Sequence, residues 1–318
     1  MDKKLDKKDI DILWQLHLDS KQTHTKIAKK LKIPKETVKY RIEQLVKKKI
    51  IKKFYAINDS SKLGLTTYQI FLKIQGLPAS KQKKFVEEMK KIPNISWFVK
   101  TSGKFSFLLA FLVKNPQEFY ESYSIIRELF KKTIKEYYIN MPIERTQFDY
   151  PFFKNHGCSR ISFKNYNKSM EVDELSLNIL NILSENCRVP IKEIAEKLNS
   201  NEKTIKSKIS FLEKSHLIIK YGVHMLPGKV GYFFYLMLIR FNIPNLEIEK
   251  YIQNLPEIFH ITRGIGVFDL QLEFYCSTEG RIYEIEEELY EKYGNFISNI
   301  DIMHISKEYL VKYFVKNK

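Results

Sequence analysis

The side chains with the clearest potential for chemistry lie in one short basic segment, residues 35–47. They recur at the three- and four-residue spacing that gathers side chains on the outer face of a helix or on its flanks. Lysine and arginine can bind phosphate oxygens or guanine edges, and threonine and tyrosine hydroxyls can donate to phosphates. The candidate contact residues for an anionic polymer are Lys35, Thr37, Lys39, Tyr40, Arg41 and Lys47.

The same spacing occurs a second time, 167 residues later in the chain. A charged helix face is usually only a solvated face, but its repetition favours contact with nucleic acid. A purely structural second copy is the alternative. The candidate contact residues of the second copy are Lys203, Thr204, Lys206, Ser207 and Lys208.

Three helices and a strand must position each set. Asp6 is a suitable N-cap for the first helix, and Thr23 or Thr25 for the second. Pro34 suits the first turn of the third helix. Two helices joined by a tight turn form the helix-turn-helix (HTH) pattern, and a following strand over residues 50–57 makes it a winged version. We expect helices at residues 6–18 and, in the second copy, at about 173–184, 191–198 and 201–215.

The distribution of charge differs between the copies. The chain of 318 residues has a formal net charge of +17, which suggests a polyanionic partner. Residues 1–60 hold 17 Lys and Arg against 8 Asp and Glu, a net charge of +9. Residues 172–226 hold 8 against 7, a net charge of +1. Since non-specific DNA affinity is largely phosphate neutralisation, we expect the first copy to bind more strongly.

The ninety or so residues after each winged helix predict a second kind of domain. Their order is strand-helix-strand-strand-helix-strand, the ferredoxin-like arrangement. Such a sheet has helices on one face only, and the apolar residues of its strands need a partner on the other face. The other copy in the same chain is the simplest partner. The expected fold is α+β, with two winged HTH domains alternating with two ferredoxin-like domains, at residues 1–60, 61–150, 172–226 and 227–318, and with a connecting segment at 151–171.

Several functional classes receive no support. Cys158, Cys187 and Cys276 lie far apart without a C-x-x-C pattern, which argues against a disulfide framework or a zinc site and fits a reducing cytoplasm. The longest apolar run, Tyr232–Ile239, is far shorter than the roughly 20 residues of a membrane span. No nucleophile elbow, P-loop or paired catalytic carboxylate is recognisable. We therefore expect a soluble cytoplasmic protein without a metal or cofactor, and not an enzyme.

An ordered set of motifs resembles the leucine-responsive regulator/AsnC family of transcriptional regulators, the feast/famine regulators. The family pattern is one winged helix and one ferredoxin-like sensing domain per chain, so the tandem duplication departs from it. The resemblance implies DNA-binding regulation by a small effector such as an amino acid, in an intramolecular pseudo-dimer or a higher homo-oligomer. It rests on Leu5-Asp6-x-x-Asp9-x-x-Ile12-Leu13, Ile27-Ala28-x-x-Leu31, Thr37-Val38-x-x-Arg41-Ile42-x-x-Leu45, Ile50-Ile51-Lys52-x-Phe54, Leu63-Gly64 and Gly103-x-Phe105.

Family members resemble switches whose effectors bind between sensing domains near a Gly-x-aromatic-Asp turn. Ser106 replaces the acidic residue in the first copy, so at most one intact site of this kind remains. The alternative is structural, because glycines favour the hairpin and Asp269 can bond the turn backbone. The implied effector residues are Gly103 and Phe105 in the first copy and Gly266, Phe268 and Asp269 in the second.

Two other functional classes stay open. The sirohaem decarboxylases look like this architecture, and the resemblance implies that His260 and Arg263 meet tetrapyrrole carboxylates, with His260 assisting proton transfer. The first copy has Trp97 and Lys100 at those positions. The other class is an effector sensor that does not bind DNA. The favoured interpretation is a sequence-specific DNA-binding transcriptional regulator that contacts double-stranded DNA, does not bind membranes, and contacts a second, degenerate half-site about one helical turn away.

Overall fold

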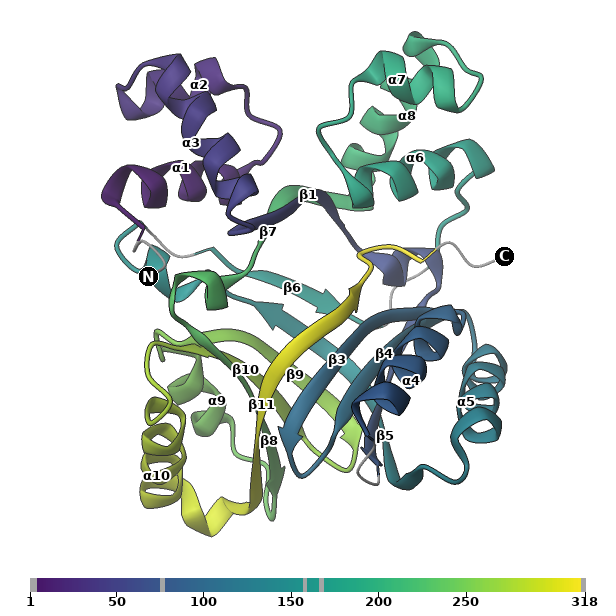
Figure 1. Ribbon diagram of the computed structural model, residues 1–318, viewed down its shortest axis with the longest axis vertical. Helices are drawn as coiled ribbons and strands as arrows, with labels where there is room; N and C mark the ends of the chain where they lie inside the picture. The colour runs from purple at the N-terminus through teal and green to yellow at the C-terminus, as the bar shows by residue number, and fades with distance from the viewer. Residues whose placement is uncertain (1–4, 75–77, 157–158, 166–168, 316–318) are drawn as a thin grey trace.

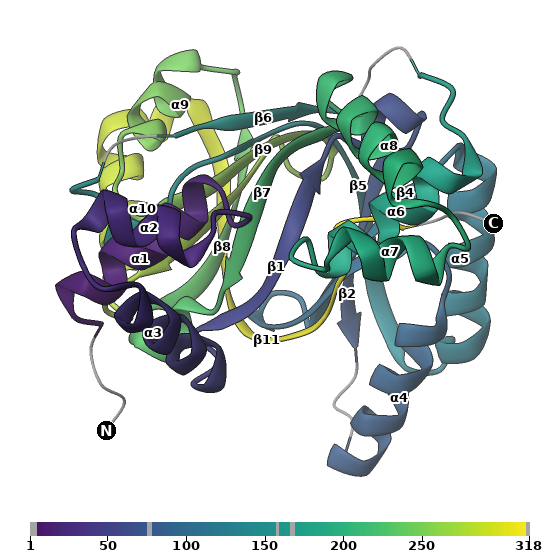
Figure 2. The same ribbon diagram turned by 90° about the horizontal axis from the view of Figure 1, so that it is seen from above.

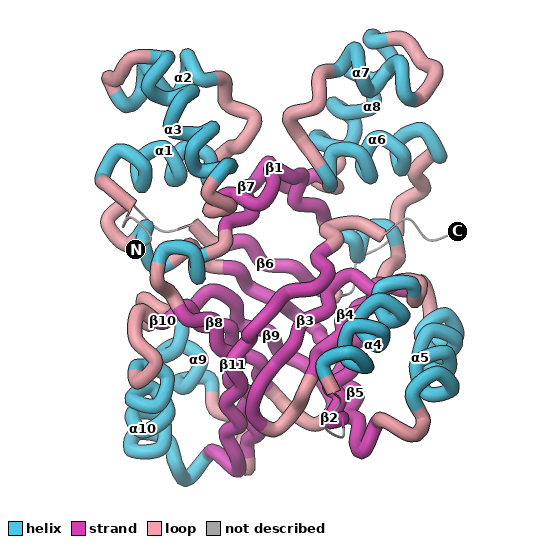
Figure 3. The backbone as a smooth tube through the Cα atoms, in the orientation of Figure 1, coloured by secondary structure: helices cyan, strands magenta, loops and turns pink. Residues whose placement is uncertain are grey.

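The computed structural model describes residues 5–74, 78–156, 159–165 and 169–315. Two three-helix domains stand on either side of a two-stranded ribbon, with a large sheet flanked by helices beneath them (Figures 1 and 2). Colouring by secondary structure separates these layers, with strands in the middle of the molecule and helices around them (Figure 3).

The first helical domain follows from local signals in the sequence. It contains α1 (Lys7–Leu18), α2 (His24–Leu31) and α3 (Lys35–Lys47). The Asp6 carboxylate accepts a hydrogen bond from the Asp9 N–H, and the Thr23 hydroxyl accepts one from Lys26, so both predicted N-caps are confirmed. The apolar stripes meet in one core, which confirms the predicted HTH arrangement.

The second helical domain repeats the first. It contains α6 (Glu174–Glu185), α7 (Ile191–Lys197) and α8 (Glu202–Lys214). Asp173 caps α6 through the Ser176 N–H, and Asn201 caps α8 through the Thr204 N–H. Each element lies where the repeat predicts it.

The wing strands are shared between the two copies. β1 (Ile51–Asn58) pairs antiparallel with β7 (Ile218–Met225), and together they form the wing ribbon. Val223 and Met225 of β7 pack into the core of the first helical domain, and Ala56 of β1 packs into the core of the second. The sequence predicted the strands, but it did not show that each domain is completed by the strand of the other copy.

The two ferredoxin-like units join into one sheet that closes on itself. Its strands run in the order β2-β4-β3-β11-β8-β10-β9-β5, and β5 also pairs with β2 to close the ring. Helices of both units cover its outer face (Figure 1). The first unit contains β2 (Thr66–Ile74), α4 (Ala79–Lys91), β3 (Ile95–Gly103), β4 (Phe107–Val113), α5 (Pro116–Phe130) and β5 (Ile134–Gln147). The second contains β8 (Phe233–Phe241), α9 (Leu246–Gln253), β9 (Ile258–Gly266), β10 (Leu270–Cys276), α10 (Arg281–Tyr293) and β11 (Ile297–Val311).

The joints between the units are two strand pairs, β3 with β11 and β5 with β9. β5 and β11 are the two longest strands of the closed sheet, and their C-terminal halves pair with the other copy. The lower interior of the closed sheet holds an apolar cluster to which both units contribute, so the predicted partnership of the two sheets is confirmed. The buried members of this cluster are Phe71, Val99, Phe105, Leu108, Leu236, Leu238, Phe268, Met303 and Ile305.

The connecting segment contains more structure than its polar composition suggests. A short 3-10 turn at Pro151–Phe153 places the Phe153 ring in the core of the first helical domain. β6 (Ile161–Lys164) then adds a ninth strand along β5. Residues 157–158 and 166–168 of the segment lie outside the described residues, as does Cys158.

The described residues contain neither a membrane-spanning helix nor a cluster of metal ligands. None of their helices combines the length and the apolar character needed to cross a membrane. In the same part of the chain, no three His, Cys, Asp or Glu side chains gather as a metal site would require. Cys187 and Cys276 are buried as free thiols.

Candidate nucleic-acid interface and interior cavity

The second helix of an HTH motif is called the recognition helix, and in the first copy it is α3. This helix presents a free basic face. Val38, Ile42 and Leu45 are buried in the domain core, which turns the intervening positions of α3 outward. Of the predicted contact residues, Lys35, Lys39, Tyr40 and Lys47 are exposed and Thr37 is half-buried. The hydrophobic spacing therefore places these five side chains on one accessible face.

Arg41 has a structural role that the sequence did not indicate. Its guanidinium lies 2.8 Å from an Asp6 oxygen and 2.7 Å from an Asp9 oxygen, so it ties α3 to the start of α1. These hydrogen bonds, to Asp9 first and then to Asp6, raise the pKa of Arg41. The repeat preserves the tie, because Lys208 pairs with Asp173 in the same way.

The recognition helix of the second copy carries fewer free cations. Lys203 and Ser207 are exposed and Thr204 is half-buried, as the predicted contact face requires. Lys206, however, lies 3.5 Å from the Glu202 carboxylate one turn earlier. At the position of Glu202 the first copy has Lys35, 167 residues earlier. One charge reversal thus adds a cation to the first helix and neutralises one on the second.

The same reversal occurs twice more on the preceding helix. Glu193 and Glu196 of α7 correspond to Lys26 and Lys29 of α2. Both glutamates hold lysines of their own helix, Lys197 at 2.9 Å and Lys192 at 3.9 Å respectively. Glu36 and Lys203 show the opposite reversal. The helices α2 and α3 together carry a net charge of +5 and α7 and α8 together +2, so the HTH helices account for three of the eight units by which the two copies differ.

The two helical domains contact each other at the pseudo-two-fold axis. The Ser20 hydroxyl and the Cys187 thiol occupy equivalent positions of the repeat and lie 3.2 Å apart. Arg188 donates from Nε to the Ser20 carbonyl at 2.6 Å, and its guanidinium lies over the Phe54 ring. Together with the wing ribbon, these contacts fix the separation of the recognition helices.

The predicted effector glycines and aromatic residues lie at the joints between the units. Phe105 and Phe268 are buried in the shared apolar cluster, with ring centroids 6.2 Å apart. Gly103 and Gly266 have φ angles of 120° and 145°, where the strand of the other unit passes close by. A Cβ at either position would lie only 2.7 Å from a backbone carbonyl oxygen of that strand. These four residues therefore have a structural role, which the sequence could not separate from ligand binding.

Asp269 also bonds the backbone, as the structural alternative expected. Its carboxylate accepts a hydrogen bond from the Phe241 N–H at 2.8 Å. Ser106, at the equivalent position, accepts one from the Ile74 N–H at 3.2 Å. Because both side chains make the same bond at the end of a strand, the change from acid to serine does not mark the loss of a ligand site.

A different site lies inside the molecule, between the wing ribbon and the upper end of the closed sheet. It is a cavity of 230 Å³. β1 and β7 supply its roof through Tyr55 and His224, and strands from both units supply its walls. Lys164 of β6 and Lys312 lie along its lining. His260, a candidate already from the sequence, lies in its lining, but the sequence did not predict the cavity.

Two polar clusters face each other across this cavity. On one wall, His260 Nδ1 lies 2.6 Å from a Glu273 carboxylate oxygen, and both residues are buried. Burial lowers the pKa of His260, although Glu273 opposes the shift. On the other wall, Glu308 accepts a hydrogen bond from Trp97 Nε1 at 3.0 Å and lies 3.5 Å from His224 Nε2. Burial acts to raise the pKa of Glu308, but these two partners hold it below its ordinary value.

The comparisons with known proteins agree with the geometry of the HTH domains. A family model described as winged helix-turn-helix DNA-binding matches residues 5–52 and 172–219. An uncharacterized HTH-type transcriptional regulator of Pyrococcus horikoshii is 33% identical over 116 residues, 36% of this chain and 71% of its own length. The HTH-type transcriptional regulator LrpA of the same organism is 38% identical over 107 residues, 34% of this chain and 68% of its own. The chain belongs to the leucine-responsive regulator/AsnC family.

Solved structures show how much of this regulator has a known fold. The crystal structure of the siroheme decarboxylase NirDL covers 96% of the regulator and 94% of its own chain, with a TM-score of 0.65 at 15% identity. E. coli AsnC covers 43% of the regulator and 94% of its own chain, with a TM-score of 0.35 at 16% identity. The first match extends over both copies, so the duplicated two-domain fold occurs in a solved protein.

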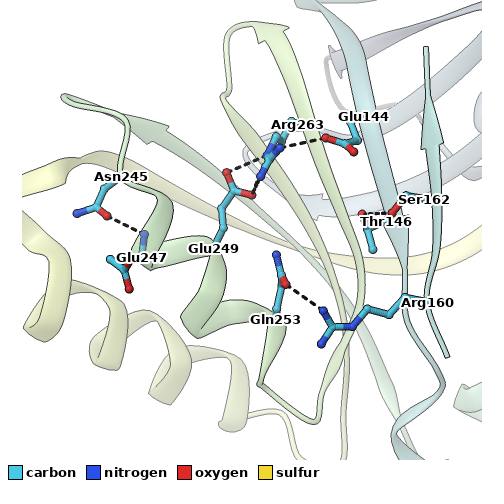
Figure 4. A network of polar contacts seen from close by, with 9 residues as sticks. All are labelled: Glu144, Thr146, Arg160, Ser162, Asn245, Glu247, Glu249, Gln253 and Arg263. Atoms are coloured by element: carbon cyan, nitrogen blue, oxygen red, sulfur yellow. Dashed lines mark hydrogen bonds and ion pairs between the residues drawn. The ribbon is translucent and has the colours of Figure 1, made fainter. Parts of the chain in front are cut away.

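His260 and Arg263 do not meet in this regulator. Strand residues alternate between faces, so His260 points inward and Arg263 outward. Arg263 is held by Glu249 of α9, with the closest contact at 2.6 Å, and by Glu144 of β5 at 3.0 Å (Figure 4). The pair on which the decarboxylase alternative rested is therefore split between two faces of the sheet.

Proposed function

We propose that this regulator binds a specific, asymmetric double-stranded DNA site and that its first HTH domain supplies most of the affinity. The observation that carries the proposal is the triple charge reversal between equivalent positions. In the second copy, Glu193, Glu196 and Glu202 each neutralise a lysine of their own helix, whereas the first copy has lysines there. Each of these reversals adds two units of positive charge to the first domain relative to the second, and the opposite reversal at Glu36 and Lys203 removes two.

Counterion release gives this difference a measurable form. Each phosphate neutralised by a cation contributes about 0.9 to the slope of log K against log salt concentration. The first domain therefore contributes more to the salt slope than the second. Base contacts are assigned to the exposed or half-buried hydrogen-bonding groups of α3 and α8. These are Lys35, Thr37, Lys39, Tyr40 and Lys47 in α3, and Lys203, Thr204, Lys206 and Ser207 in α8. Arg41 and Lys208 are excluded from this set because they tie helices together.

The rigid connection between the domains supports binding to two places on one duplex. The Ser20–Cys187 contact and the wing ribbon keep α3 and α8 at a fixed separation. HTH pairs of this kind contact half-sites one helical turn apart. Since the two domains present different charges, the preferred target has one strong and one weak half-site.

Binding is tested with DNA from upstream of the protein's own gene, competed by a duplex of shuffled sequence. Specific binding requires that the shuffled duplex compete poorly. Lys39→Ala and Lys206→Ala remove lysines at equivalent positions, so each serves as the control for the other. We expect the Lys39 variant to lose more affinity and more salt dependence. Equal losses would overturn the asymmetry, and equal competition by the shuffled duplex would overturn specificity.

Regulation by a small effector is part of the proposal. The residues first assigned to effector binding line the joints between the units, so the effector needs another site. The cavity beneath the wing ribbon is suitably placed, because β1 and β7 form its roof and also complete the two DNA-binding domains. A ligand there would contact the element on which both recognition helices depend.

The decarboxylase alternative is supported by the fold of the whole chain and by the His260–Glu273 pair. It is weakened by the position of Arg263, which Glu249 and Glu144 hold on the outer face of the sheet. Anaerobic addition of sirohaem tests it directly. A Soret shift with release of carbon dioxide would overturn the assignment as a regulator without enzymatic activity.

A further inference from the structure

Two histidine–carboxylate pairs join the first helical domain to the segment that follows β5. His17 of α1 is 3% exposed, and its Nε2 lies 2.6 Å from an Asp149 carboxylate oxygen. His156 lies further along that segment, and its Nε2 lies 2.7 Å from an Asp11 carboxylate oxygen of α1. Each side thus supplies one imidazole and one carboxylate. We call these four residues the histidine junction.

Asp149 is held in place from its own side of the junction. One of its oxygens accepts a hydrogen bond from the Ser159 N–H at 2.6 Å, and the other accepts one from the Ser159 hydroxyl. Burial acts to raise the pKa of Asp149, but His17 and Ser159 hold it below its ordinary value. The carboxylate therefore stays ionised in mild acid, so His17 is the member of this pair that can take up a proton.

His17 is enclosed by aromatic rings. The ring centroids of Trp14, Tyr150 and Phe153 lie 5.7, 5.9 and 5.2 Å from that of His17. Removing a charged imidazole from water is costly, so this burial lowers the pKa of His17. A protonated ring would also carry an N–H at Nδ1, and no described residue makes a hydrogen bond to that nitrogen. The closed junction therefore favours the neutral form of His17.

The charged groups that face α1 do not reverse this preference. Burial is the largest effect on the pKa of His17, Asp149 opposes it, and the charge of Lys220 on β7 acts with it, so the pKa stays below its ordinary value. The charged groups that α2 and α3 present to α1 are bonded to other residues of the chain. These are Lys30, which donates to Gln15, and Arg41, which bonds Asp6 and Asp9.

The internal repeat confines the histidine junction to the first copy. The second copy has Asn178, Ser184 and Lys312 at the positions equivalent to Asp11, His17 and Asp149. None of these three side chains gains or loses a proton near neutral pH. A change of pH in this range can therefore act at these positions on the support of one helical domain and not on that of the other.

We propose that the histidine junction is closed at neutral pH and opens in mild acid, and that its opening frees the first helical domain from the segment after β5. One proton from the solvent adds to His17 when the junction opens. Phe153 of this segment is packed in the core of the first helical domain, so opening loosens that domain and leaves the second one in place.

The direction of the effect follows from the linkage between proton binding and opening. In the open state, water surrounds His17 and its pKa is about 6.5. In the closed state its pKa is lower, because the ring is buried. The open state therefore takes up the proton first, and the closed state loses stability relative to it as the pH falls below about 6.5.

Trp14 reports on the junction because its ring stacks on that of His17. The chain has two tryptophans, so Trp97→Phe leaves Trp14 as the only one. In this background, we expect the Trp14 fluorescence to change reversibly between about pH 7.5 and pH 5.5, with a midpoint below about 6.5, while the far-ultraviolet circular dichroism stays the same. Fluorescence that does not change over this range would overturn the proposal.

Two variants in the same background assign the change to one side chain. His17→Gln can still donate a hydrogen bond to Asp149 but cannot take up a proton, so it should abolish the change in fluorescence. The matched control is His24→Gln, another histidine of the first helical domain, which begins α2 and lies outside the junction. It should keep the change. A change that persists in the His17 variant, or that disappears in the His24 variant, would refute the assignment.

A second measurement needs no substitution and decides the matter if the His17 variant does not fold. Nuclear magnetic resonance of the unsubstituted protein follows the His17 ring protons as the pH is lowered. A pKa below about 6.5 in the closed state supports the proposal, and a pKa at or above that value would contradict it.

The junction itself does not depend on the proposed function, but its effect on DNA binding does. At constant ionic strength, we expect the unsubstituted protein to lose DNA affinity by about fivefold or more between about pH 7.5 and pH 5.5, and the His17→Gln variant to lose less. Equal losses would refute the coupling. If the protein binds no DNA at the higher pH, the proposed function fails and the Trp14 fluorescence still tests the junction. If DNA binds but the fluorescence does not change, the junction fails and the proposed function stands.

Discussion

A charge reversal at Lys35 is the sharpest test of how this regulator holds DNA. The Lys35→Glu substitution reproduces in the first copy what the second copy already has at Glu202. There, the Glu202 carboxylate lies 3.5 Å from Lys206. The substitution should therefore remove one cation and also pair Lys39, one turn later on α3. An acidic residue in the first turn of a helix is favourable, so we expect the domain to stay folded.

The magnitude follows from counterion release. Two phosphate contacts correspond to a loss of about 1.8 in the slope of log K against log salt concentration. Extrapolated from 1 M to about 0.1 M salt, that slope corresponds to roughly a 60-fold loss of affinity. The reciprocal Glu202→Lys substitution frees Lys206 and adds a cation, so it should strengthen binding and steepen the slope.

Fluorescence anisotropy with one labelled duplex over a series of salt concentrations measures both quantities. Lys84→Glu is the matched control, because it makes the same change in net charge at an exposed position of α4, far along the chain from the HTH helices. If the Lys35 and Lys84 variants lose affinity equally, only the net charge matters and the assigned interface is wrong. An unchanged slope in the Lys35 variant would refute the phosphate contacts themselves.

Three further predictions concern stability. Arg41→Ala should lower the free energy of unfolding by about 0.5–1 kcal/mol, because it breaks the partly exposed ion pairs with Asp6 and Asp9. It should leave the salt slope of DNA binding unchanged, and a reduced slope would show that Arg41 contacts DNA. Gly103→Ala and Gly266→Ala should each lower the free energy of unfolding, measured in urea, by about 1–3 kcal/mol, because φ is positive and a Cβ would meet a carbonyl oxygen. Unchanged stability in both variants would contradict the close approach of the strands. Burial lowers the pKa of His17 more than its Asp149 partner raises it. The unfolded chain therefore takes up a proton on this histidine at a higher pH than the folded protein does, so the free energy of unfolding should fall as pH drops below about 6.5. Urea midpoints between about pH 7.5 and pH 5.5 measure this fall, and a His17→Gln variant with an undiminished fall would assign it to other groups.

Local signals in the sequence predicted the helical domains well. Asp6 and Thr23 are the observed N-caps, and the apolar spacing of α1 to α3 gives the observed core. Such signals depend on residues that lie within one or two helical turns of each other, so they can be read directly from the sequence. The exchange of β1 and β7 left no comparable signal, because a strand's residues do not specify which strand pairs with it.

The candidate sites also divide into features that follow from local spacing and features that depend on how distant elements pack. The exposure of Lys35 and Lys39 follows from helical spacing, whereas the tie made by Arg41 depends on how α1 crosses α3. The cavity was missed because its lining comes from many strands. One signal was available in β10, where Gln271 and Glu273 alternate with apolar residues on a face expected to be buried. Polar residues at inward positions of a strand indicate a buried polar site.

The shared wing ribbon also constrains how the protein can be made. On the ribosome, the first helical domain emerges early, but the strand that completes its core lies at Ile218–Met225. Until that strand is synthesised, part of the apolar surface of the nascent domain stays open and is exposed to aggregation. A gene truncated after the first unit should therefore yield a chain whose first helical domain keeps this apolar surface exposed.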